Sequence, residues 1–304
     1  MNLSRRLLDL VRGALIGVVE VIPGVSGGTI ALIVGVYDDL IGSAGSLVRG
    51  VVRTAVDPLR GKGMTHASAH FREVKWAVVL PIGIGMIAAV VVAASIVAPL
   101  IDEHPVETRA LFTGLIIASI AVPARMVGGF WRLREYGLAA VAIVAAFFLT
   151  GIPAADPVDP SPIVIGLAAA VAICALVIPG LSGSFILLTV GMYAPTLAAV
   201  NDRDFAYLGV FMLGAIIGLG LFVSVLQWLL EHRRRVTLAI MTGLMIGSLR
   251  ALWPWQGDGG QLRAPEGDVL PAVLLFAGGI LVVTSLLIVE SRVRRRQLTQ
   301  DARG

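Results

Sequence analysis

The chain has 304 residues, of which 57% are hydrophobic and 14% are charged. Soluble globular proteins have about 45–50% apolar and about 25% charged residues, so this composition excludes a soluble protein. It predicts an all-α polytopic membrane protein with one transmembrane domain. The formal net charge is +4, but the arginines lie between the apolar runs, a distribution typical of membrane topology rather than of a nucleic-acid partner.

The first unusual stretch is EVIPGVSGGTIALIVGVY at residues 20–37, which places a carboxylate, a proline and four glycines inside an apolar run. Proline lacks the amide that continues a helix, and glycine tolerates reversed backbone geometry. Pro23 and Gly24 are therefore predicted to break the helix into two arms of roughly 12 residues. Each arm spans only about 18 Å, which is too short to cross a hydrocarbon core of about 30 Å. Paired arms of this length predict a re-entrant hairpin.

The same pattern returns 156 residues later in the chain. VIPGVSGGTIALIVGVY at 21–37 aligns with VIPGLSGSFILLTVGMY at 177–193, with 11 identical positions out of 17. A second match pairs TGLIIAS at 113–119 with TGLMIGS at 242–248. These matches predict an internal repeat, in which Pro179 and Gly180 break the second hairpin.

The repeat divides the chain into two units, residues 1–155 and 156–304. Each unit is expected to hold one re-entrant hairpin and three membrane-crossing helices. The expected crossing segments are about 76–101, 108–124, 137–152, 207–230, 236–253 and 269–289.

The charges predict how these segments are oriented. Twenty of the 24 Lys and Arg residues fall on the side of the N-terminus in this layout. The positive-inside rule assigns that side to the cytoplasm, so both termini are predicted to be cytoplasmic. Three crossings per unit then give an inverted-topology repeat, with the first hairpin entering from the cytoplasm and the second from outside. Secondary transporters often have this architecture and bind substrate where their broken helices meet.

Small and hydroxyl-bearing residues follow both breaks and predict an anion site. Ser26 can cap the second arm of the first hairpin, and the amides of the first helical turn lack partners within the helix. Helix N-termini of this kind bind phosphates. A single Pro-Gly-x-Ser-Gly could merely kink a helix for close packing, whereas two copies favour an anion site. The predicted headgroup-binding residues are Ser26, Gly27, Gly28, Thr29, Ser182, Gly183 and Ser184.

Glu20 is the only carboxylate that this layout places deep in the membrane. An intramembrane acid is a candidate for function, and two interpretations stay open. It could be a protonated acid hydrogen-bonded to a carbonyl group freed by the break. It could instead couple transport to protons, because like-charge repulsion from an approaching phosphate favours its protonated form.

Other polar residues give weaker signals. Arg109, Arg125 and Arg250 lie near the ends of crossing segments, where arginines commonly extend to lipid headgroups, and the sequence leaves their contact with substrate open. His66 and His70 are four residues apart but have no third ligand, so no metal site and no cofactor are expected.

At these residues the chain resembles the PopT-type polyprenyl-phosphate transporters. The resemblance rests on EVIPGVSGGTIALIVGVYDDL, ALFTGLIIAS and VIPGLSGSFILLTVGMY, and the order of segments extends it over essentially the full length. Where the family pattern has Asp, this chain has Glu20, which keeps an acid. The resemblance implies a flippase, not an enzyme, in the bacterial plasma membrane. It would return undecaprenyl or decaprenyl phosphate from the outer to the cytoplasmic leaflet for reuse in peptidoglycan synthesis. Polyprenyl phosphate, bilayer lipids and protons are the expected partners, and the oligomeric state is open.

Two other functions remain open. A transporter of a small soluble anion could use the same helix termini. A polyprenyl-diphosphate phosphatase has similar re-entrant repeats and a similar turn, but its turn continues with an arginine that holds phosphate. This chain has Gly27 and Gly183 at the matching positions, and no second intramembrane acid accompanies Glu20.

Overall fold

The computed structural model describes residues 3–20, 27–56, 65–153, 155–157, 160–257 and 260–301. Within these residues the fold is helical, apart from one isolated bridge between Gln256 and Leu262. Pro23, Gly24 and Ser26, which the sequence places at the first break, lie outside the described residues.

The N-terminal half contains α1 (Leu3–Glu20), α2 (Gly27–Ile33), α3 (Tyr37–Val56), α4 (Thr65–Glu73), α5 (Trp76–Glu103), α6 (Pro105–Met126) and α7 (Leu133–Leu149). The C-terminal half contains α8 (Pro162–Val177), α9 (Gly183–Thr189), α10 (Tyr193–Asn201), α11 (Phe205–His232), α12 (Arg234–Ser248), the 3-10 turn η2 (Leu249–Leu252) and α13 (Val269–Asp301). Helices therefore occupy all six segments predicted to cross the membrane.

Four helical segments of the described chain are long and apolar enough to span a membrane, namely α5, α6, α11 and α12 continued by η2. The bent pair α9 and α10 could supply a fifth span. These lengths and compositions confirm a polytopic membrane protein. α7 has only 17 residues, which is short for a bilayer crossing.

The broken segments differ from the predicted pairs of equal arms. α2 and α9 have only seven residues each, because a second break follows at Gly35 and Gly191, both with φ of 72°. In each case the amide directly after the glycine donates back across the turn, from Val36 to the Ala31 carbonyl and from Met192 to the Leu187 carbonyl. This is a Schellman-type cap, which favours glycine at the left-handed position. The prediction of arms of about 12 residues was therefore wrong.

Helices at equivalent positions in the two halves make equivalent contacts. α1 packs along α5, as α8 packs along α11. α6 packs on α13, and α12, which aligns with α6, packs on α7. Glycine allows these close approaches: Gly114 of α6 faces the Phe276 carbonyl of α13, and Gly243 of α12 faces the Ala139 carbonyl of α7. Gly114 and Gly243 hold the same place in TGLIIAS and TGLMIGS.

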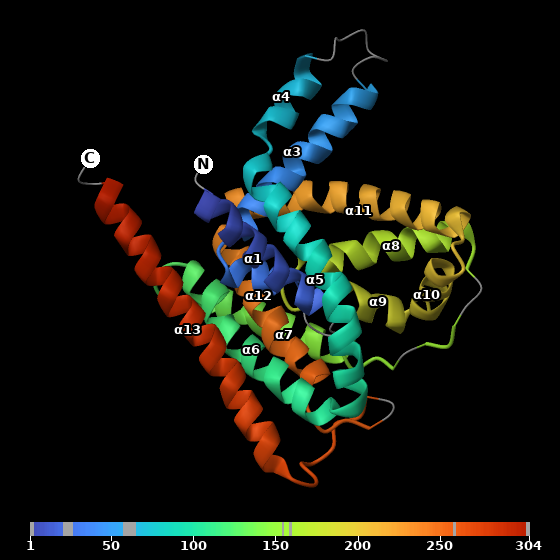
Figure 1. The fold of residues 1–304 in the computed structure, drawn as a ribbon, viewed down its shortest axis with the longest axis vertical. Coiled ribbons are helices and arrows are strands. Elements are labelled where there is room, and N and C mark those ends of the chain that lie inside the picture. Colours follow the sequence, from blue (N-terminus) through green and yellow to red (C-terminus); the bar gives the residue numbers. More distant parts are fainter. Residues whose placement is uncertain are drawn as a thin grey trace.

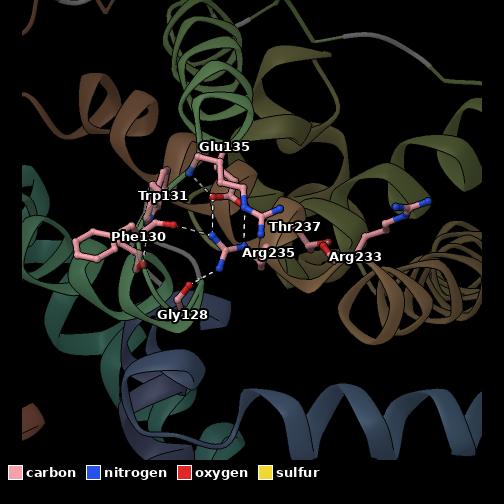
Figure 2. A network of polar contacts seen from close by, with 9 residues as sticks. Gly128, Phe130, Trp131, Glu135, Arg233, Arg235 and Thr237 are labelled. Carbon is pink, nitrogen blue, oxygen red and sulfur yellow. Dashed lines mark hydrogen bonds and ion pairs between the residues drawn. The ribbon is translucent and has the colours of Figure 1, made fainter.

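An arginine network joins the loop after α6 to the junction of α11 and α12 (Figure 2). Nε of Arg235 donates to Oε1 of Glu135 at 2.7 Å, and Nη2 donates to Oε2 at 2.9 Å. The same guanidinium donates to the carbonyl oxygens of Gly128 and Phe130. The loop between α6 and α7 is thereby fixed to the start of α12.

The N-terminal part of α3 joins the same end of the molecule. Arg234 forms an ion pair with Asp38 at 3.3 Å, and Lys75 forms one with Asp39 at 2.6 Å. The arginine-rich segments 42–75, 125–135 and 231–235 thus meet at one end. Figure 1 shows α3 and α4 projecting there, on the side where α1 begins and α13 ends.

The segments predicted for the other membrane side meet at the opposite end. Oγ1 of Thr113 in α6 donates to the Leu252 carbonyl of η2 at 2.6 Å. The amide of Ala155, in the linker after α7, donates to the Leu188 carbonyl of α9. The turn between α5 and α6 and the start of α13 also lie toward this end in Figure 1.

We expect Gly243→Ala to lower the free energy of unfolding in detergent micelles by about 1–3 kcal/mol, because overpacking forces helices apart. A methyl group there would meet the Ala139 carbonyl and the Ala142 side chain. Gly209→Ala in α11 is the matched control, since its methyl group would have no neighbour within 4 Å. Equal stability of the two variants would contradict the prediction.

Candidate functional site

The two broken hairpins touch in the protein interior. Thr29 of α2 is fully buried, and its Oγ1 accepts a hydrogen bond from the Gly180 amide at 3.3 Å. Gly180 has φ of 90°, a conformation that disfavours any residue with a Cβ. It lies against α12, where a Cβ would come within 2.7 Å of the Met245 amide nitrogen. The second bend is therefore held between α2 and α12.

Tyr37 makes a second connection between the hairpins. Its hydroxyl donates to the carbonyl of Val177, the last residue of α8, at 3.3 Å. Tyr37 is 4% exposed, whereas Tyr193, which aligns with it, is 39% exposed. A Gly-x-Tyr sequence thus follows each short helix, at residues 35–37 and 191–193. Its glycine ends the short helix in both halves, whereas its tyrosine bridges the hairpins only from the N-terminal half.

Two hydroxyl groups lie at the start of α9. Ser182 occupies the N-cap position, but its side chain makes no capping hydrogen bond. Its Oγ instead pairs with Oγ of Ser184 at 2.8 Å. Gly183 packs tightly on α8, where a Cβ would lie 2.6 Å from the Ala172 carbonyl oxygen. Ser182 therefore leaves the first-turn amides of α9 without the side-chain cap that the sequence pattern suggested.

Glu20 ends α1 and folds back toward the start of α2. Its carboxylate accepts a hydrogen bond from the Gly27 amide, and a Cβ at Gly27 would collide with Oε1 of Glu20. Gly27 and Gly28 are both buried. One of the amides predicted to receive a substrate anion thus already holds an internal carboxylate. The aligned position in the other half is Leu176, so only the first hairpin has this acid.

Sequence reasoning treated TGLIIAS and TGLMIGS only as a repeat and missed their polar residues. Ser119 of α6 and Ser248 of α12 are buried at aligned positions. Each donates to a carbonyl of its own helix, Ser119 to Leu115 and Ser248 to Met245. Met245 is also the residue against which Gly180 packs. The serine that ends each motif was the sequence signal that could have predicted these buried polar positions.

The sequence left open whether three arginines contact substrate, and the structure places them at two ends of the molecule. Arg125 is exposed at the end of α6. Arg109 and Arg250 are partly buried at the other end of the molecule. Nη1 of Arg109 lies 3.5 Å from the Pro254 carbonyl, and Nη1 of Arg250 donates to the Phe147 carbonyl at 3.1 Å.

His70, the second histidine of the pair in α4, lies beside a carboxylate. Nδ1 of His70 lies 3.2 Å from Oε2 of Glu73, in the hairpin that α3 and α4 form. In the part of the chain that the structure describes, no three His, Cys, Asp or Glu side chains gather to hold a metal ion.

Comparison with known proteins finds a family whose model covers most of the chain. Residues 16–269 match a family described as VCA0040-like, undecaprenyl phosphate translocase-like. A similar protein from Vibrio cholerae, named polyprenyl-phosphate transporter, is 35% identical over 252 residues, covering 82% of this chain and 78% of that protein. One from Staphylococcus aureus with the same name is 25% identical over 263 residues, covering 81% of this chain and 86% of that protein. No solved structure matches.

We expect Thr29→Val to lower the free energy of unfolding by about 1–3 kcal/mol, because the buried Gly180 amide loses its acceptor. Thermal or denaturant unfolding in detergent micelles measures the loss. Thr29→Ser keeps the oxygen and should cost less than Thr29→Val. If Thr29→Val is as stable as the native chain, the hydrogen bond between the hairpins contributes nothing.

Proposed function

Because this chain belongs to the undecaprenyl phosphate translocase-like family, we propose that it returns polyprenyl phosphate from the outer to the cytoplasmic leaflet for reuse. The contact between Thr29 and Gly180 is the observation that supports this most directly. It joins two helix breaks inside one membrane-embedded core, which is where inverted-repeat transporters bind their substrates. The polyprenyl tail would stay in the lipid while the headgroup passes between the hairpins.

The phosphate headgroup would be bound by the residues that the sequence predicts for it. They are the predicted residues Ser26, Gly27, Gly28, Thr29, Ser182, Gly183 and Ser184. A charged phosphate in apolar surroundings is very costly unless hydrogen-bond donors compensate it. The paired hydroxyls of Ser182 and Ser184 supply such donors. The buried glycines 27 and 28 let an anion approach the backbone closely.

The proposal includes an inverted repeat made of residues 1–155 and 156–304. The equivalent helix contacts of the two halves support such a repeat. The arginine-rich segments gather at the end bearing α3 and α4, and Lys and Arg favour the cytoplasmic side. That end is therefore assigned to the cytoplasm, and both termini with it. The end formed by η2 and the starts of α6 and α13 then faces outward.

Electrostatics makes proton coupling part of the proposal. A phosphate monoester carries about −1.5 to −2 charges near neutral pH. Each charge moved across 100 mV is worth about 2.3 kcal/mol, so importing a dianion into a negative interior is uphill by roughly 4–5 kcal/mol at that potential. Protons that enter with the phosphate remove this electrical cost and add the energy of the pH gradient.

Glu20 is the proposed carrier of a coupled proton. Ionised Glu20 holds the Gly27 amide and would repel an arriving phosphate. Protonation from the outside weakens that hydrogen bond, because charge-assisted bonds are the stronger ones, and makes the amide available to the phosphate. On the cytoplasmic side, loss of the proton lets the carboxylate recover the amide and displace the headgroup. Anion and proton thus bind and leave together.

We expect Glu20→Gln to abolish the dependence of transport on external pH, since the amide side chain does not titrate. The measurement is the rate of polyprenyl phosphate movement in proteoliposomes at a series of external pH values. Glu20→Asp is the matched control and should keep a pH dependence, because it keeps an acid. A native pH profile in Glu20→Gln would contradict proton coupling through this residue while leaving the transport assignment intact.

Loss of this protein from cells should raise the amount of polyprenyl phosphate in the outer leaflet, which surface labelling of the lipid phosphate measures. Restoring the protein should reverse the change. An unchanged leaflet distribution would contradict the proposed function. With purified protein, uptake of labelled inorganic phosphate without lipid carrier would favour a small-anion transporter, and phosphate release from polyprenyl diphosphate would favour a phosphatase.

A further inference from the structure

Arg250 has hydrogen-bonding capacity that the protein does not use. Its guanidinium lies against Gly151, and its Cζ is 4.8 Å from the ring centroid of Phe147. Nη1 donates to the Phe147 carbonyl at 3.1 Å. Nε is buried and has no hydrogen-bond partner within the described chain. A guanidinium has five N–H donors, and a buried donor without an acceptor is costly.

Arg235 shows what a purely structural arginine looks like in the same protein. Its guanidinium donates to both carboxylate oxygens of Glu135 and to the carbonyls of Gly128 and Phe130. No comparable set of acceptors surrounds Arg250 in the described residues. The donors of Arg250 are thus paired less completely than those of Arg235.

Arg109 lies at the same end of the molecule and is also partly buried. Its Nη1 lies 3.5 Å from the Pro254 carbonyl, at the long limit for a hydrogen bond. Pro254 is four residues from Arg250, and the bond from Thr113 to Leu252 fastens α6 to this segment. Neither arginine forms an ion pair with a carboxylate among the described residues. Two guanidinium groups thus lie at this end without an ion-pair partner in the described part of the chain.

The position of Arg250 connects this end to the hairpins. Gly180 of the second bend packs on Met245 of α12. Arg250 is five residues further along α12 and η2, which is roughly 8 Å along the helix axis. The backbone of Arg250 is therefore about one and a half helical turns from the residue that packs on the second bend.

We propose that Arg109 and Arg250 form an entry site for a phosphate monoester, which holds the lipid headgroup before it reaches the hairpins. The planar fork of a guanidinium matches phosphate oxygens in a bidentate geometry. Two arginines also balance the charge of about −1.5 to −2 that a phosphate monoester carries. The assignment of this end to the outer leaflet rests on the proposed function.

The first test compares Arg250→Gln and Arg109→Gln with native protein in proteoliposomes. Each change should raise the apparent KM for polyprenyl phosphate about tenfold or more, because hydrogen bonds to charged groups are the stronger ones. Arg250→Lys keeps the charge without the fork and should give a smaller rise. Arg263→Gln is the matched control, since Arg263 is exposed near the same segment and should leave KM unchanged. A native KM in both arginine variants would overturn the proposal.

Phe147→Leu separates binding from packing. It removes the ring under Arg250 but keeps the guanidinium and the Phe147 backbone carbonyl as its acceptor. We expect its KM to stay near the native value even if its melting temperature falls as far as that of Arg250→Gln. A rise in KM equal to that of Arg250→Gln would assign the effect to lost packing and overturn the entry site.

Binding to purified protein tests the site without any transport. Farnesyl phosphate, a short prenyl phosphate, should raise the melting temperature of the native protein but not that of the Arg109→Gln, Arg250→Gln double variant. Equal stabilisation of both would overturn the site even if the native protein transports lipid. If inorganic phosphate stabilises the native protein at the same concentration at which farnesyl phosphate does, the ligand is a free anion, and the lipid assignment is overturned. Failure of the native protein to transport, with binding intact, would instead contradict the proposed function.

Discussion

A chain that leaves its helix inside a membrane must find partners within the protein for the backbone groups that it frees. Here side chains of the N-terminal half supply several of them. Thr29 accepts from the Gly180 amide, and Tyr37 donates to the Val177 carbonyl. Glu20 accepts from the Gly27 amide. Because two of these bonds join the hairpins, neither bend can move far from the other without exposing an unpaired backbone group to an apolar environment.

The two halves therefore share a pattern of helices but differ in the polar groups that their hairpins carry. Both have a Pro-Gly sequence before a seven-residue helix and a glycine-based cap after it. Thr29 aligns with Phe185, and Glu20 aligns with Leu176. The first hairpin thus provides the acid and the bridging hydroxyls, whereas the second provides the serine pair at 182 and 184. An anion between the hairpins would meet different groups from its two sides.

Much of this arrangement could be predicted from periodic apolar runs and from the repeated motif. All six long segments are helices, and the repeat indicated which breaks should meet, as Thr29 and Gly180 do. The second break was missed because Gly35 and Gly191 sit in apolar surroundings that read as helix interior. The partner of Glu20 could not be predicted, since it depends on how α1 folds back over α2. The headgroup site and the inverted orientation remain predictions, and Pro23, Gly24 and Ser26 lie outside the described residues.

The anchoring of α12 at both ends limits where the protein can change shape. Arg235 ties its start to the loop before α7, and Thr113 ties η2 at its other end to α6. A helix held in this way keeps a constant height in the bilayer relative to α6 and α7. If the chain moves lipid as proposed, the least costly movement is therefore one of α2 and α9 together, because their seven residues close few backbone bonds.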